Sequence, residues 1–158
     1  MTISFNETTS SNYDCSGCNN KCEEFDHFPE FDSLTEMPNT SEVNLDCIDD
    51  TSVPRFGFIS LQSEYESVFG AQMGVMQDEC DTNSLPIVDF AQRSIIWFYT
   101  TSQIANTKLV REGDTLSYFV KVKESIFATA RFRMNCVSIP KIEPNDTIVF
   151  KPYTYGCN

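Results

Sequence analysis

The chain has one histidine, few glycines and no long apolar run. Any Ser-His-Asp or Cys-His arrangement would have to use His27, so nucleophilic catalysis of that kind is not expected. Six glycines without a Gly-rich fingerprint argue against a phosphate-binding loop or a dinucleotide motif. The longest apolar stretch, residues 95–99, has the length of a strand, whereas a membrane-spanning helix needs about 20 apolar residues.

A secretory signal is also lacking, because residues 1–5 contain neither a basic region nor an apolar one. Seven cysteines are nevertheless many for a cytosolic chain of this size that holds no metal. Two explanations stay open: a signal was removed and Met1 is a cloning start, or the protein is intracellular. We favour the first, a secreted or cell-envelope location, with any membrane attachment made through a lipid anchor that the printed chain lacks.

Charge divides the chain near residue 52. Residues 1–52 hold twelve Asp/Glu and one Lys, a net charge of −11, whereas residues 53–158 hold eleven Asp/Glu and ten Lys/Arg, a net charge of −1. A polyanionic segment repels phosphate, so nucleic acid and anionic membranes are not expected as partners. We therefore predict an acidic, Cys-containing and partly disordered arm over 1–52 and a single antiparallel β domain over 53–158. Spaced aromatic residues of the arm could pin it onto the domain: Phe25, Phe28 and Phe31.

The predicted fold class is mainly β, of α+β type: an antiparallel meander sheet, or a partly open barrel or sandwich, with one short helix. The segment 94–100 is the most apolar of the chain, and residues 95–99 run without alternation, which indicates a central strand covered on both faces. The helix is expected over 63–69, begun by a Ser63/Glu66 capping box and ended at Gly70. Asp89 is expected in a turn. The other expected strands lie at 53–61, 104–112, 115–123, 127–136 and 147–150, with a turn at 113–114.

Residues 115–123 and 127–136 alternate cleanly between apolar and polar. We predict that 116–122 and 128–134 form an antiparallel hairpin in which paired numbers sum to 250, so that Tyr118 faces Phe132 on the core side. The opposite side would then form a mixed basic and aromatic surface. That surface is our candidate binding patch for an acidic or extended partner, including the protein's own arm: Phe119, Lys121, Lys123, Phe127, Arg131 and Arg133.

The cysteines favour disulfides over a metal. Cys15, Cys18 and Cys22 could join His27 around zinc, but the second ligand pair of a usual finger is missing. We expect at least two disulfides, no metal and no cofactor, with Cys136 as the unpaired thiol because it continues the apolar parity of its strand. A carboxylate pair for hydrolysis would have to come from acids that caps, turns or solvated faces also explain: Glu64, Glu66, Asp89, Glu112 and Asp114.

The order of landmarks resembles a known family. A Ser-x-x-Glu helix start leads to Leu85-Pro86-Ile87-Val88-Asp89-Phe90, the apolar strand 95–99, two alternating strands and the late Ile139-Pro140-Lys141. Over about residues 56–151 this is similar to the small secreted proteins and lipoproteins grouped around PrcB, the accessory subunit of a spirochaete surface protease complex, with related domains in Bacteroidetes envelope proteins. Residues 100–105 lack the Gly-Gly-Tyr-like stretch that such domains often have.

The resemblance implies an interaction role and carries no catalytic residues. Our leading expectation is a secreted or envelope-associated, non-enzymatic protein-binding module. Its partner would be another protein, such as a protease or an envelope component. The alternative is an intracellular zinc- or iron-binding regulatory protein organised by the cysteines at 15, 18 and 22, and the third is a hydrolase that uses a carboxylate pair.

Overall fold

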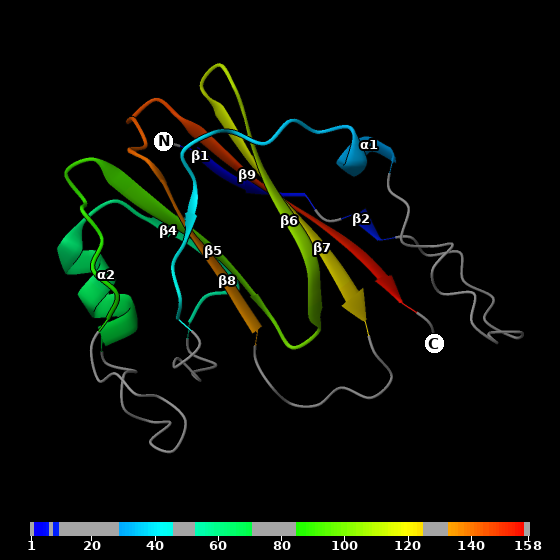
Figure 1. Cartoon of the computed structure of the whole chain (residues 1–158), viewed down its shortest axis with the longest axis horizontal. Helices are drawn as coiled ribbons and strands as arrows, with labels where there is room; N and C mark the ends of the chain where they lie inside the picture. Colours follow the sequence, from blue (N-terminus) through cyan, green and yellow to red (C-terminus); the bar gives the residue numbers. More distant parts are fainter. Residues whose placement is uncertain are drawn as a thin grey trace, which may run out of the picture. The chain divides into compact units, whose positions relative to one another are not determined.

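The computed structural model describes residues 2–6, 8–9, 29–45, 53–70, 85–124 and 133–156. Over these residues it confirms the mainly β class, with two sheets and two helices (Figure 1). The chain forms two compact units: the first contains residues 1–38, 101–131 and 143–158, and the second contains 39–100 and 132–142. Neither helix of the described residues has the length and apolar composition of a membrane-spanning helix.

The second unit contains an antiparallel sheet with the strand order β3-β8-β5-β4. Its strands are β3 (Ser41–Glu42), β8 (Arg133–Pro140), β5 (Arg93–Thr100) and β4 (Phe56–Ile59). The prediction of a central strand is confirmed, because β5 lies between β8 and β4 and residues 95–98 are all buried.

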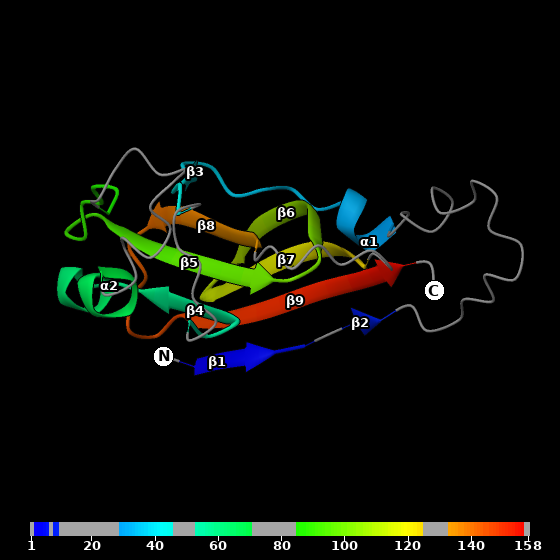
Figure 2. The same cartoon turned by 90° about the horizontal axis from the view of Figure 1, so that it is seen from below.

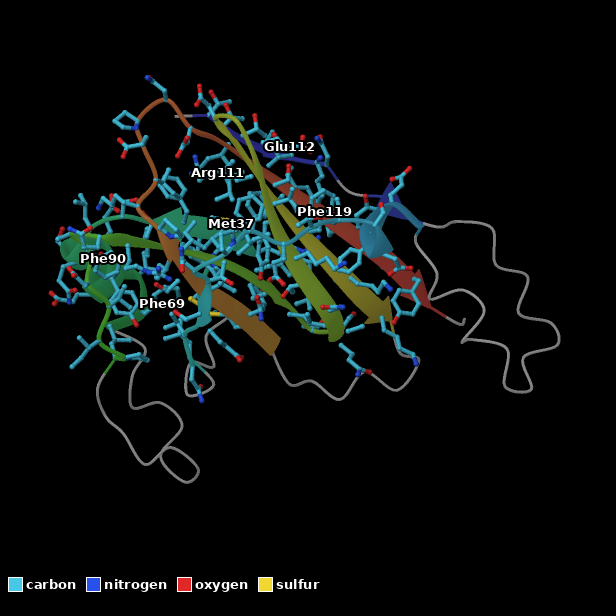
Figure 3. All side chains as sticks on the ribbon, turned by 45° about the horizontal axis from the view of Figure 1, so that its top comes forward. Met37, Phe69, Phe90, Arg111, Glu112 and Phe119 are labelled. Atoms are coloured by element: carbon cyan, nitrogen blue, oxygen red, sulfur yellow. The ribbon has the colours of Figure 1, made fainter. Side chains whose placement is uncertain are left out.

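Helix α2 (Gln62–Phe69) covers the core of this unit. It buries Tyr65 and Phe69 beside Trp97, and Figure 3 shows Phe69 and Phe90 near one another at this helix. The helix and its end at Gly70 agree with the prediction, but the capping box is wrong. The N-cap is Leu61 and makes no side-chain cap, so Ser63 already lies inside the helix.

The sheet of the first unit has the strand order β1-β9-β7-β6, and β2 also pairs with β9. The strands are β1 (Thr2–Phe5), β2 (Thr8–Thr9), β6 (Gln103–Glu112), β7 (Thr115–Glu124) and β9 (Thr147–Gly156). β6 pairs antiparallel with β7, but β9 runs parallel to β7, β1 and β2, so the expected all-antiparallel meander is wrong here. The chain between β7 and β9 passes through β8 of the other sheet, and this connection provides the length that a parallel pair requires.

The predicted hairpin is also wrong. Tyr118 pairs with Leu109 on β6 and with Phe150 on β9, so both edges of β7 are occupied, whereas Met134 on β8 pairs with Tyr99. Residues 125–132 lie outside the described part of the chain. The alternating pattern correctly indicated a strand at 115–124, but many apolar strands could complement it, and the pattern alone does not choose among them.

Parts of residues 1–52 belong to both sheets. β1 and β2 pair with β9, β3 pairs with β8, and the short helix α1 (Pro29–Asp32) packs in the first unit. The boundary at residue 52, as a limit of independent folding, stays a prediction. Six cysteines and His27 lie outside the described residues, so the predicted disulfides and the alternative metal cluster are untested. The remaining cysteine, Cys136, is free and buried as predicted.

Candidate functional site

The strands β6, β7 and β9 present alternating cationic and aromatic side chains on one face of the first sheet. In one cross-strand row, Phe119 lies between Lys108 on β6 and Lys151 on β9; in the next row of that face, Lys121 pairs with Tyr153. Residues two apart on a strand point to the same side, which brings the two rows together. We call these five residues the lysine–aromatic face.

The ring of Phe31 from helix α1 packs on the lysine–aromatic face and is fully buried. It meets Tyr153 edge to face, with the ring centroids 6.2 Å apart, while Phe119 and Tyr153 stack at the same separation. Figure 2 shows α1 near the carboxyl ends of β7 and β9, and Figure 3 shows Phe119 on the sheet beside that helix. Segments distant in the sequence therefore build one aromatic cluster.

Three lysines lie over these rings. Lys108 Nζ is 5.2 Å and Lys121 Nζ is 5.1 Å from the centroid of Phe31, and Lys151 Nζ is 4.8 Å from that of Phe119. Such distances permit cation–π attraction, worth about 0.5–1 kcal/mol at exposed sites and more where water is removed. The face is thus suited to an aromatic side chain inserted between ammonium groups.

The Lys108 ammonium also binds the backbone that follows Phe31. It donates hydrogen bonds to the carbonyl oxygens of Phe31, Asp32 and Leu34, at 3.0, 3.3 and 3.3 Å. The last carbonyls of a helix lack partners within the helix and carry partial negative charge, so a cation is favourable there. Lys108 therefore holds the end of α1 whatever side chains that segment carries.

Acidic side chains of the same segment complete the contact. Lys121 Nζ lies 3.9 Å from Asp32 Oδ1, and the Tyr153 hydroxyl donates to Glu30 Oε2 at 3.5 Å. Burial, and then the neighbouring Glu30 carboxylate, raise the pKa of Tyr153, which stays a neutral donor. The lysine–aromatic face therefore binds, in residues 30–32, an aromatic ring with a carboxylate on each side.

The segment continues along the open edge of the sheet. The backbone N–H of Met37 donates to the carbonyl oxygen of Leu109 on β6, at 2.7 Å. Leu34 packs against the cluster of Phe31, Phe119 and Tyr153. The side chains of Phe31, Asp32 and Leu34 thus contact the face, and the backbone at Met37 pairs with the strand edge.

The candidate patch of the sequence analysis is partly corrected by this arrangement. Phe119 and Lys121 were expected on an exposed face but are only 6% and 7% exposed, because the segment around Phe31 covers them. Lys123 is exposed. Phe127 and Arg131, like the side chain of Arg133, lie outside the described part. Since β7 and β8 belong to different sheets, Arg133 does not lie on a strand that neighbours β7, as the prediction required.

The expectation that Phe31 pins the arm onto the domain is confirmed. Lys108, Lys151 and Tyr153 were missed, because the pattern over 104–112 is weak and the last strand was expected to end at residue 150. The sequence feature that could have indicated them is their spacing. Lys108 and Val110 are two residues apart on one strand and Lys151 and Tyr153 on another, so each pair lies on one face.

The five candidate acids of a hydrolase are all exposed. Asp89 forms the predicted turn, where its Oδ1 accepts a hydrogen bond from the Ala91 N–H at 3.0 Å. The described residues contain no group of three or more His, Cys, Asp or Glu side chains that could hold a metal ion.

Comparisons with family models, curated proteins and solved structures found no match to this chain. The resemblance to PrcB-like proteins therefore stays a prediction. The geometry of the lysine–aromatic face carries the functional argument.

Proposed function

We propose that this protein is a secreted or envelope-associated, non-enzymatic binding module that recognises acidic–aromatic segments of another protein on its lysine–aromatic face. The observation that carries the proposal is the burial of Phe31 among Lys108, Lys121 and Tyr153. The chain's own residues 29–37 then act as a built-in ligand that a partner segment of similar chemistry replaces.

Two features favour recognition over packing alone. The contacts of Lys108 are with backbone carbonyls, which any segment can offer, and those of Phe31 require only an aromatic ring. Lys151 and Lys123 have no carboxylate partner among the described residues. A partner with more acidic residues than the chain's own segment would gain ion pairs at these two lysines.

A peptide titration tests the proposal. A fluorescent peptide with the sequence of residues 29–37 is added to the wild-type chain and to the Phe31→Ala variant. The variant should bind the peptide at least about tenfold more tightly than the wild type does. In the wild type the site is occupied by the chain's own segment, so only the fraction of molecules with an open site can bind the peptide.

A matched peptide with Ala in place of its Phe should lose most of this binding, and adding Lys121→Glu to the variant should do the same. Equal binding of the two peptides, or no binding to the variant, would remove the proposal. The milder Phe31→Leu variant provides the same comparison if Phe31→Ala unfolds.

A further inference from the structure

The segment Leu85–Asp89 in the second unit projects one apolar side chain into solvent. Ile87 is 101% exposed, the most exposed large apolar side chain among the described residues. No hydrogen bond of the described residues engages its backbone N–H or C=O. A single exposed apolar residue is ordinary, so the surroundings of Ile87 decide its meaning.

The residues on both sides of Ile87 are anchored. The carbonyl oxygen of Pro86 accepts a hydrogen bond from the Tyr65 hydroxyl at 3.2 Å, and Leu85 and Val88 pack against the core that contains Phe90. The side chain of Ile87 is therefore held outward by a fixed backbone. Presenting an apolar group in this way reduces the entropy lost when a partner binds.

Two hollows flank this ridge. One, of about 350 Å³, lies between α2 and residues 85–88. The other, of about 290 Å³, lies between β3 and residues 86–89. Each has room for an apolar side chain of a partner. The ridge therefore offers a protruding side chain, a free peptide group and a hollow on either side.

The rim of this surface is acidic. Glu66 lines the first hollow, and Glu42 and Asp89 line the second. None of these three carboxylates forms an ion pair among the described residues. The guanidinium of Arg93, which also lines the second hollow, is engaged by the Ser138 hydroxyl and carbonyl at 2.9 and 2.8 Å.

We infer that this surface, the Ile87 ridge with its two hollows, docks an extended segment of another protein that carries apolar side chains flanked by Lys or Arg. The apolar side chains fill the hollows beside Ile87, the basic ones meet Glu42, Glu66 and Asp89, and the backbone pairs with the free peptide groups of Ile87. The chemistry is opposite to that of the lysine–aromatic face, so the chain has two surfaces with different partners.

A random library of roughly twelve-residue peptides displayed on phage, selected on the full chain, tests this inference. Peptides that need Ile87 should be enriched, should carry Lys or Arg beside apolar residues, and should bind at least about tenfold more weakly to Ile87→Asp. Glu42→Lys and Glu66→Lys should each weaken them about threefold or more.

Ile3→Asp and Glu112→Lys, which change exposed residues of the first unit, are the matched controls and should leave binding unchanged. Because Ile87 is exposed, its variant should keep the wild-type thermal midpoint. Peptides that depend on Lys121 and not on Ile87 report on the lysine–aromatic face instead. Failure to enrich any Ile87-dependent peptide, enrichment of acidic ones, or a homodimer that Ile87→Asp dissociates would overturn the inference.

Discussion

The ammonium group of Lys121 lies over the ring of Phe31, with Nζ 5.1 Å from the ring centroid. Phe31 belongs to the acidic N-terminal part of the chain and Lys121 to an interior strand, so the contact joins the part of the sequence with a net charge of −11 to the nearly neutral remainder. A buried lysine needs a compensating partner, and the ring and the Asp32 carboxylate provide one. The acidic segment is therefore complementary to this face in both shape and charge.

Replacing Phe31 by Ala should destabilise the chain by about 3–5 kcal/mol, since it removes a fully buried ring. Denaturant unfolding of the full chain measures this change. Ile87→Ala is the control, because the Ile87 side chain is exposed and its removal should change the free energy of unfolding by no more than about 0.5 kcal/mol. Similar midpoints for the Phe31 variant and the wild type would show that the ring is not packed as described.

Stability should fall at acid pH partly through Asp146. Two hydrogen bonds from Arg111, at 3.0 and 2.8 Å, lower the pKa of this buried carboxyl below its usual 3.8, and one from the Glu143 N–H at 2.9 Å acts in the same direction. The folded chain thus holds this proton less tightly than the unfolded chain. The contribution of the ionised Asp146 carboxylate to folding stability is complete above its ordinary pKa. It is lost as the pH falls through the lower pKa that this group has in the folded chain.

Asp146→Asn should cost about 1–3 kcal/mol at neutral pH, because the guanidinium keeps only weaker acceptors. The gap in unfolding free energy between the variant and the wild type should then narrow as the pH falls below 3.8. Glu112→Gln, at an exposed residue of the same unit, is the control and should leave the pH dependence nearly unchanged. A gap that is constant with pH would contradict the role given to the Arg111 pair.

Cys136 should resist alkylation in the folded protein. Burial raises the pKa of its thiol to about 12, so almost no thiolate exists near neutral pH, and the side chain is only 1% exposed. Iodoacetamide at about pH 8, followed by peptide mapping, should leave Cys136 unmodified until denaturant is added. Rapid labelling of Cys136 in the native chain would show that this strand opens or is misplaced.

Gly57→Ala should disturb the second unit, because a Cβ at this position would overlap the indole ring of Trp97. The ring is held by a hydrogen bond from Trp97 Nε1 to the Pro54 carbonyl at 2.9 Å, so it cannot swing away cheaply. The free energy of unfolding of the Gly57→Ala variant should be about 1–3 kcal/mol lower than that of the wild type. Gly113→Ala, at a turn residue with φ of 58°, should cost only about 1 kcal/mol and serves for comparison.

The helix at 62–69 and the strand 93–100 could be predicted because each is marked by a local pattern, either helical spacing of apolar residues or an unbroken apolar run. The partners of β7 could not be predicted, since its alternation shows which residues are buried but not by what. The burial of Phe119 could not be predicted for the same reason, because the cover on that face comes from Phe31, far away in the sequence. The lysine–aromatic face is assembled from three strands, and a fourth segment, around Phe31, covers it, so no local sequence pattern could predict the arrangement.

Hydrogen exchange at residues 34 and 37, with and without a saturating acidic–aromatic peptide, measures whether a partner segment displaces residues 29–37 from the lysine–aromatic face. In the free chain the N–H groups of Leu34 and Met37 donate to the carbonyls of Phe31 and Leu109, so both should be protected. The peptide should lower this protection by about tenfold or more, because it replaces residues 29–37 on the lysine–aromatic face. Unchanged protection with the peptide bound would show that residues 29–37 are not displaced, and fast exchange at both positions in the free chain would show that they do not cover the face.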